Sequence, residues 1–505
     1  MKKLIFIILG LISMLSSYGQ NISDAVRYST GTTLGTARFK SMSGAFGALG
    51  GDISAVSINP AGSAIFNTSH GSLSASNVNT SNKAEFGSNP NTQKIKNDSF
   101  DMNQIGAVFV FKNKDLNSNY NKFAASVFYE QLQNYNSGFF AAGVSSNSIA
   151  SYFSDYANGL SLDDISALEN ESISEAYNAI GFYNGYAYQQ AFLGYESYIL
   201  EPEEDSSENS AYYSNIASGD FNQEYSYSSL GYNGKLSFNL GLQYNQNIYF
   251  GINLNSHFIN YERSTYLFES NANTGSTINE VDFENSLLTI GNGFSVQLGA
   301  IFKLNNFIRI GMAYDSPTWL TLTEETTQYI STFDNSENIQ TVINPAVINL
   351  FPEYKLKTPA KITGSAAFII SDKGLISFDY SRKDFTSARY KSNTSYGYSQ
   401  ENNLISNSLK VANTLRIGAE IRHKKISYRG GYNIEESPYK NSSVYGDLKG
   451  FSLGLGFNFS ESRLDLSYQN SKRKIDQQLF NAGNLGSAKL NTNNSNVSIT
   501  LSMNL

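Results

Sequence analysis

The chain has 505 residues, with 36 Lys and Arg against 43 Asp and Glu, three His and no Cys. The lack of cysteine excludes disulfides, thiol nucleophiles and thiolate zinc sites. A net charge of −7 disfavours a general nucleic-acid binder, which normally carries a basic face. His70, His257 and His423 lie far apart in the sequence without HxH or HxxxH spacing, so we expect no metal site, no cofactor and no enzyme activity.

Residues 1–19 have the form of a secretory signal peptide. Met1-Lys2-Lys3 is basic, the stretch from Leu4 to Leu15 is almost entirely apolar, and Ser17-Tyr18-Gly19 offers small residues for cleavage before Gln20. A transmembrane anchor is the alternative, but the apolar stretch is shorter than the roughly 20 residues that a spanning helix needs. We therefore expect a secreted protein, a periplasmic protein or a membrane β-barrel.

Residues 20–66 do not alternate between apolar and polar positions. They are rich in small residues, as in Gly44–Gly51, and their helix-compatible stretches are broken at Pro60. Such a segment can fill the interior of a wide barrel as a plug. A disordered leader is the alternative, although disordered leaders rarely contain apolar residues such as Leu49 and Val56. We expect a lumenal hatch over residues 20–66.

From residue 67 onward the sequence alternates with a period of two. We expect strands near 69–80, 99–111, 121–134 and 221–244, and the clearest later alternation covers 248–254, 415–421, 451–459 and 497–505. Half-apolar strands of this kind fit either a soluble sandwich or a membrane barrel.

Strand length, aromatic content and connection length favour the membrane barrel. Many segments reach the nine to eleven residues or so that cross a bilayer at a tilt, and aromatic residues, 13 % of the chain, recur near strand ends as in an interfacial girdle. Short turns are expected at 245–247, 305–306, 372–374, 423–425 and 460–462, and long polar loops near 271–290, 326–352, 393–407, 437–447 and 470–491. The sequence predicts an all-β fold: an antiparallel transmembrane barrel of about fourteen strands over 67–505, with its short turns in the periplasm.

The stretch 135–220 interrupts this alternation. Apolar residues fall at helical spacing around Tyr152 and Tyr156, around Ile173 and Ile180, and around Phe192 and Tyr195, and Ser161 is expected to cap a helix. We expect a helical extracellular insertion. Its exposed aromatic residues could capture an apolar ligand from water, or its stripes could simply pack on each other. The candidates for capture are Tyr152, Phe153, Tyr156, Phe192 and Tyr195.

A motif in the N-terminal segment is specific to one family. The runs Met42–Phe46, Asp52–Ala55 and Ile58–Gly62, with Asn59-Pro60-Ala61 at their end, resemble the hatch of the FadL/TodX family of outer-membrane transporters. Later stretches agree with the family pattern along nearly the whole mature chain: Gly311–Pro317, Thr358–Ala360, Ser377–Tyr380, Arg416–Glu420 and Arg429–Tyr432. Two features depart from it, namely a C-terminal Leu505 in place of Phe and the long region 135–220.

The resemblance implies passive uptake of long-chain fatty acids or other hydrophobic compounds through a hatch-gated barrel in the bacterial outer membrane. It implies that the hatch shifts on ligand binding and that cargo can leave sideways through the wall. The residues that match the gate are Gly44, Phe46, Asn59, Pro60, Ala61 and Gly62. We expect a monomer surrounded by outer-membrane lipids, inserted by the barrel-assembly machinery, with a hydrophobic small molecule as ligand.

The inward face of the late strands carries Arg416, Glu420, Arg422 and Arg429, which predict a charge ladder in the lumen, and one of these cations could hold a substrate carboxylate. Three other functions stay open at this point. They are a FadL-like shuttle component of a protein secretion system, a structural or adhesive surface barrel, and a soluble extracellular β protein.

Overall fold

The computed structural model describes residues 21–115, 117–392, 397–459 and 461–505. The predicted signal peptide 1–19 lies outside the described residues, and so does Ser460 of one predicted turn. Among the described residues, no helix has the length and apolar character needed to cross a membrane.

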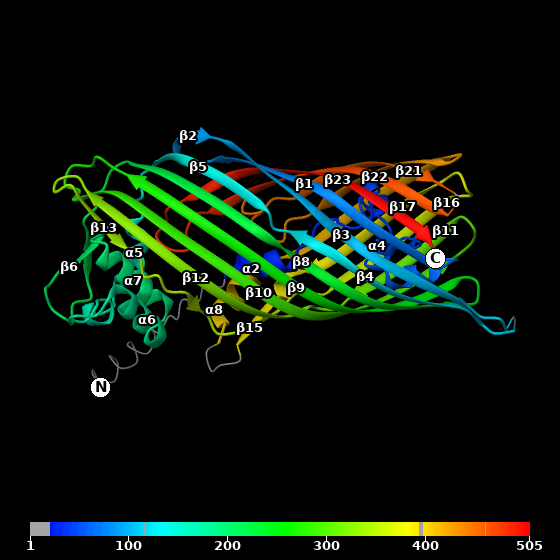
Figure 1. Ribbon diagram of the computed structural model, residues 1–505, viewed down its shortest axis with the longest axis horizontal. Coiled ribbons are helices and arrows are strands. Elements are labelled where there is room, and N and C mark those ends of the chain that lie inside the picture. Colours follow the sequence, from blue (N-terminus) through cyan, green and yellow to red (C-terminus); the bar gives the residue numbers. More distant parts are fainter. Residues whose placement is uncertain (1–20, 116, 393–396, 460) are drawn as a thin grey trace.

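A closed antiparallel barrel of fourteen strands forms the body of the molecule (Figure 1), which confirms the predicted barrel fold. Its ladder closes where the last strand pairs with the first, from His70↔Asn504 to Glu85↔Lys489. Going round the wall in chain order, the strands are β1 (His70–Glu85), β3 (Lys94–Lys112), β4 (Tyr120–Asn134), β8 (Phe221–Tyr244), β9 (Ile248–Ser270), β10 (Ile278–Lys303), β11 (Ile308–Asp315), β16 (Lys361–Ile370), β17 (Gly374–Asp384), β19 (Val411–His423), β20 (Ile426–Glu435), β21 (Leu448–Asn458), β22 (Ser462–Gln478) and β23 (Ser487–Asn504).

Each of the fourteen strands exposes large apolar side chains on the outside of the barrel. One such residue from every strand, in order, is Leu73, Phe109, Val127, Phe238, Leu254, Leu298, Met312, Phe368, Phe378, Leu415, Tyr428, Leu453, Leu466 and Leu501. The inward positions between them are mostly Ser, Asn, Thr, Gly and Gln. An apolar outer band on a closed barrel is the arrangement that lipid requires, because a closed barrel leaves no unpaired backbone edge. The chain is thus a transmembrane barrel.

The strands extend well beyond the membrane on the side opposite the short turns. Seven further strands extend the sheet on that side: β2 (Ser88–Thr92), β5 (Ser137–Ser145), β12 (Trp319–Asp334), β13 (Ile339–Ile343), β14 (Asn349–Leu350), β15 (Tyr354–Lys357) and β18 (Arg389–Ser392). The predicted long loops near 271–290, 326–352 and 470–491 are therefore wrong over much of their length. Strands there stand outside the membrane, where lipid does not impose an apolar outer face, so regular apolar alternation does not reveal them.

Two prolines interrupt neighbouring strands at facing positions. Pro317 separates β11 from β12, and Pro359 separates β15 from β16. Because proline has no N–H to donate to a ladder, the adjacent threonines complete the pairing. Thr358 N donates to Thr318 O at 2.9 Å, and Thr318 N donates to Thr358 Oγ1 at 2.8 Å.

The predicted insertion contains three helices, α5 (Ala150–Ala157), α6 (Ile173–Tyr183) and α7 (Tyr186–Glu196), and a short hairpin of β6 (Leu200–Pro202) and β7 (Tyr212–Ser214). A capping box begins α6, where hydrogen bonds from the Ser172 hydroxyl and backbone N–H hold the pKa of Glu175 below its usual range. The helix predicted from Ser161 is wrong. Only the 3₁₀ turn η2 (Leu162–Asp164) forms, and the Ser161 hydroxyl bonds to the Asp164 carboxylate.

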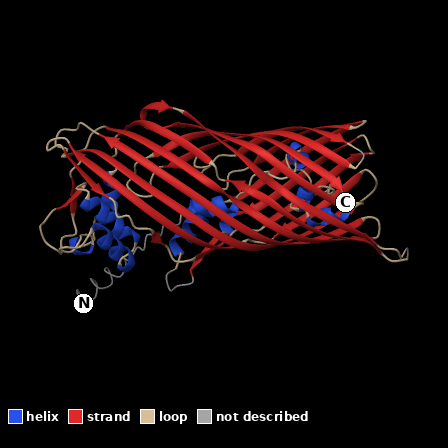
Figure 2. Ribbon diagram, in the orientation of Figure 1, coloured by secondary structure: helices blue, strands red, loops and turns tan. Residues whose placement is uncertain are grey.

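The remaining helices lie inside the barrel or at its rim (Figure 2). The N-terminal segment forms α2 (Ile22–Ser29), α3 (Ala37–Ser41), α4 (Ile53–Val56) and the 3₁₀ helix η1 (Pro60–Ile65). Between β17 and β19 lie the 3₁₀ turn η3 (Phe385–Ser387) and α8 (Ser399–Ser408). Side-chain caps from Asn21, Thr36, Asp52 and Asn59 begin the four N-terminal helices, which explains why so short a segment is so ordered.

Candidate functional site in the barrel lumen

The N-terminal segment 21–66 packs against the inner wall of the barrel, and almost every residue from 36 to 64 is buried. Its backbone bonds to inward side chains from many strands. Asn253 on β9 donates to Val56 O at 2.8 Å, Arg309 on β11 donates to Leu49 O at 2.9 Å, and Ala37 N donates to Thr500 Oγ1 on β23 at 2.7 Å. The segment is thereby fixed on both sides of the lumen.

Asn59 connects the segment to itself and to the wall. Its Nδ2 donates to Gly47 O at 2.7 Å, to Ala300 O on β10 at 3.0 Å and to Met312 O on β11 at 3.3 Å. Its Oδ1 accepts from Ala61 N at 3.2 Å and so caps η1, which Pro60 begins. Gly62 is buried here as well. Its N–H bonds to Asn59 O at 2.9 Å.

Asp379 on β17 makes the second strong attachment. Its carboxylate accepts hydrogen bonds from Phe46 N at 2.9 Å and from Gly47 N at 3.0 Å. Gly44, just before this turn, has φ +78°, a conformation that favours glycine. The structure therefore brings all six predicted gate residues into one buried block on the wall, and their action as a gate stays a prediction.

Inward glycines on the wall make the room for this block. A Cβ atom added to Gly251 on β9 would overlap the Pro60 carbonyl and Ala61 N, and one added to Gly311 on β11 would overlap the Gly47 carbonyl. Gly431 on β20 faces Met42 in the same way. Overlaps with backbone cannot be relieved by a change of rotamer, so these positions need glycine.

We expect Gly251→Ala to displace η1 from the wall, because the added methyl group overpacks the contact by about 1–3 kcal/mol. The barrel ladder itself should form normally. The measurement is protease cleavage within 36–66 in the folded, detergent-purified protein, which should become faster. Gly364→Ala is the matched control, because a Cβ there meets open space. Equal cleavage in both variants would contradict the role of Gly251.

A buried ion network holds α3 near the end of the barrel that bears the short turns. Glu420 on β19 pairs with Arg38 of α3 at 3.1 Å, with Arg429 on β20 at 2.5 Å and with Arg422 at 2.5 Å, while Arg429 also pairs with Asp465 on β22 at 2.8 Å. Of the predicted ladder, Glu420, Arg422 and Arg429 do meet. Arg416 does not join them: it stands opposite Asp379 in the register and lines a cavity instead.

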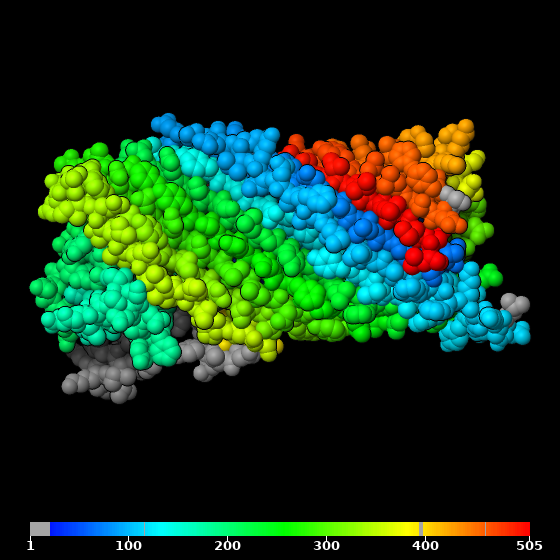
Figure 3. Space-filling model, in the orientation of Figure 1, coloured from blue at the N-terminus to red at the C-terminus, as the bar shows by residue number. Residues whose placement is uncertain are grey.

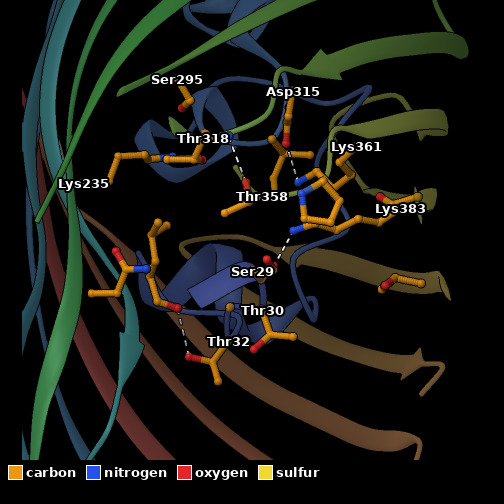
Figure 4. A pocket seen from close by; sticks show the side chains of 18 of the residues that line it. Ser29, Thr30, Thr32, Lys235, Ser295, Asp315, Thr318, Thr358, Lys361 and Lys383 are labelled. Carbon is orange, nitrogen blue, oxygen red and sulfur yellow. Dashed lines mark hydrogen bonds and ion pairs between the residues drawn. The ribbon is translucent and has the colours of Figure 1, made fainter. Parts of the chain in front are cut away.

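That cavity, here called the chamber, has a volume of about 240 Å³ and lies between the two halves of the N-terminal segment. Residues 28–34 line one side, and Ser57 and Ile58 line another. Figure 4 labels Lys235, Asp315, Lys361 and Lys383 among its charged side chains. Lys361 pairs with Asp315 at 2.6 Å, and the Lys383 ammonium donates to the Ser29 carbonyl.

The chamber lining combines apolar and charged groups. Tyr28, Leu34, Phe39, Ile58 and Phe385 supply apolar surface. The cations in the lining are Lys235, Lys361, Lys383 and Arg416, and the acidic groups are Glu130, Asp315, Glu435 and Glu436. Lys235 and Lys361 have carboxylate partners at 3.8 Å and 2.6 Å. A ligand with an apolar body and an acidic group could therefore meet both kinds of surface.

The wall beside the chamber contains a gap. The ladder between β3 and β4 ends at Gln104↔Glu130, although both strands continue beyond it. The N-terminal segment covers the gap from inside, since Thr32 N donates to Leu132 O and Asn103 Nδ2 donates to Gly35 O, both at 2.9 Å.

The five aromatic residues predicted to capture ligand lie mainly inside the insertion. Tyr152, Phe153 and Phe192 are buried in its core, and Tyr156 and Tyr195 are partly exposed and pack against that core. This is the packing arrangement that the sequence left open as the alternative to a capture surface. A role in capture stays a prediction.

Sequence reasoning missed Arg38, Asp379 and the chamber lysines as functional residues. Lys235 and Lys361 are single charges among small, polar or apolar residues, whereas Lys383 is flanked by Arg382 and Asp384, so no one local signal marks all of them. Within the part of the chain that the structure describes, no three His, Asp or Glu side chains are grouped to hold a metal ion.

No protein-family model matches the sequence, and no curated protein matches it either. Solved structures are similar in fold. A FadL homologue from Pseudomonas aeruginosa aligns over 94 % of this chain and 99 % of its own, with a TM-score of 0.53 at 12 % identity. The toluene transporter TodX from Pseudomonas putida covers 94 % and 100 %, and the monoaromatic hydrocarbon channel CymD covers 94 % and 97 %, each at 12 % identity with a TM-score of 0.49.

The similarity to the FadL homologue concerns the whole barrel, and the resemblance found in the N-terminal motif points to the same proteins. Together with the closed ladder and the apolar outer band, it places the chain among bacterial outer-membrane barrels. In fold, this protein is an outer-membrane β-barrel of the FadL type.

Proposed function

We propose that the protein takes up hydrophobic compounds, such as long-chain fatty acids, passively across the outer membrane. The observation that carries this proposal is the chamber, which is enclosed by the N-terminal segment and lies beside a gap in the wall. A hydrophobic compound gains about 0.8 kcal/mol for each CH₂ group that leaves water. Such a compound can therefore bind to the apolar surface of the chamber without an external source of energy.

The polar groups of the chamber suit an amphipathic cargo better than a plain hydrocarbon. An acidic head group would lie near Lys383 and Arg416, neither of which has a carboxylate partner within 4.0 Å among the described ion pairs. The apolar body would rest on Phe39, Ile58 and Phe385. Hydrogen bonds between these cations and an acidic head group are charge-assisted, and such bonds are stronger than hydrogen bonds between neutral groups.

The exit that we propose is the gap between β3 and β4. Leu132 and Asn103 mark its two sides, and both bond to the N-terminal segment. Movement of residues 32–35 would therefore open the chamber sideways toward lipid. The block around Asn59 would act as the gate that couples such movement to the rest of the segment.

The test is lipid extraction and mass spectrometry of the detergent-purified protein. We expect co-purified apolar acids, and we expect Lys383→Met/Arg416→Met to lose them. Lys424→Met, in an exposed turn, is the control and should retain them. An empty barrel in all three proteins would contradict the proposal, and an empty barrel that retains a secreted protein would favour the secretion shuttle.

A further inference from the structure

We propose that α5, α6 and α7 form a lid on the mouth of the barrel, with a fixed side at α5 and a hydrogen-bonded latch against β12. The lid lies at the end of the barrel opposite the short turns (Figure 1), and the space-filling view shows its atoms at that same end (Figure 3). The inference goes beyond the proposed function and relies on it only in taking the lumen as the route.

The fixed side is dry and aromatic. The Phe153 ring lies 5.2 Å from the Phe283 ring on β10, and the Tyr152 ring lies 5.8 Å from Phe283 and 5.2 Å from Phe480 in the β22–β23 connection. Gly194 of α7 packs directly on Phe153. Separating these surfaces would expose aromatic side chains to water, which is unfavourable. The contact between α5 and the wall therefore stays closed.

The other side is joined to the wall by neutral polar groups. Gln190 of α7 and Gln328 of β12 exchange two hydrogen bonds, at 2.7 and 2.9 Å. The Tyr177 hydroxyl of α6 donates to Gln328 Oε1 at 2.7 Å and accepts from Asn349 Nδ2 at 3.0 Å. Water can replace each of these partners, because amides and hydroxyls hydrogen-bond to water as well as to each other. The hydrogen bonds of the latch can therefore exchange for bonds to water, while Ile330 of β12 and Phe192 of α7 are buried in the same apolar cluster beside it.

The chain topology places the hinge of the lid on the side where the lid is connected to the barrel strands. The lid is connected to β5 before it and to β8 after it, and these two strands pair with each other. The latch lies on β12, and β9 and β10 separate β12 from β8. A lid connected on one side of the mouth and latched on another can swing. At its free end Phe182 and Tyr183 are 81 % and 80 % exposed, and their rings contact each other.

A reporter below the latch measures opening without any cargo. Thr289 is a fully buried inward residue on β10, four positions beyond Asn285, to which Gln328 bonds. The chain has no native cysteine, so Thr289→Cys carries the only thiol. The measurement is its rate of reaction with a membrane-impermeant maleimide added outside intact cells. Ser206→Cys, in an exposed loop, shows that the reagent has access.

We expect Gln328→Leu to raise the labelling rate of this reporter several-fold, because leucine keeps the bulk and removes the hydrogen bonds. Gln340→Leu, an exposed glutamine on β13, should leave the rate unchanged. Oxidation of Ser197→Cys/Thr332→Cys joins the end of α7 to β12, where the Thr332 hydroxyl bonds to Ser197 O at 2.8 Å. It should suppress labelling of Thr289→Cys, scored by mass spectrometry on the peptide that contains position 289, until the disulfide is reduced.

A labelling rate that neither Gln328→Leu nor the disulfide changes would overturn the lid. The same disulfide should also stop uptake of a radiolabelled long-chain fatty acid and release it on reduction. Labelling that responds while uptake is absent in every protein would leave the lid standing and contradict the proposed function instead.

Discussion

Replacing Asn59 by Ala is expected to abolish uptake while the barrel still folds. The change removes the donor that joins Gly47 O to carbonyls of β10 and β11, as well as the cap of η1. Each buried group left without a partner costs about 1–3 kcal/mol. Ser57 and Ile58, which precede Asn59, line the chamber, so the ligand surface would lose its shape together with the gate.

The measurement for Asn59→Ala is uptake of a labelled long-chain fatty acid, with heat-modifiable migration on a gel as the check on folding. Ionic conductance in planar bilayers should rise, because the segment no longer closes the lumen. Asn158→Ala, at the end of α5 in the helical insertion, is the control substitution of the same kind. Unchanged uptake in Asn59→Ala would contradict the gate.

Replacing Glu420 by Gln is expected to give the largest loss of stability. Glu420 is 1 % exposed and has four arginine partners, Arg38, Arg422, Arg429 and Arg463, of which Arg38 and Arg429 are themselves buried. Removing one member of a buried ion pair costs about 3–5 kcal/mol, because the remaining charges stay out of water without compensation. Arg38 would also release α3, so the N-terminal segment should detach before the barrel unfolds.

Urea unfolding of the refolded barrel measures this effect, with fluorescence of the single tryptophan, Trp319, as the probe. The control is Arg422→Gln, since the Arg422 side chain is 37 % exposed and its pair is worth about 0–1 kcal/mol. Protease cleavage of the N-terminal segment reports its release separately. Equal midpoints for the two variants would mean that Glu420 does not anchor the network.

The barrel could be predicted because each membrane strand carries its own signal. Phe238, Leu240 and Leu242 on β8 face outward and alternate with Ser237, Asn239 and Gly241, and lipid imposes this alternation on every strand in the same way. Outside the membrane the constraint disappears. Predicted loops such as 271–290 are therefore largely strands, held by a ladder whose partners are distant in sequence.

The sequence predicted individual residues of the candidate site, but it did not predict which of them lie together in the structure. Asn59-Pro60-Ala61 was found from a local motif, and its capping role follows from residue type and spacing. Arg416 and Glu420 share one face of β19, yet one lines the chamber and the other binds Arg38. That difference depends on where the N-terminal segment lies along the strand, which no local pattern records.

The sequence by itself determined the class of barrel, the number of its strands and the block of residues that attaches the N-terminal segment, because periodicity and short motifs act over a few residues. Tertiary structure alone decided the chamber, the gap beside Leu132 and the latch between Gln190 and Gln328. Each of these joins residues more than 90 positions apart. Closing the barrel brings such residues together. Only in the closed barrel does a polar side chain such as Gln328 meet the distant group to which it hydrogen-bonds.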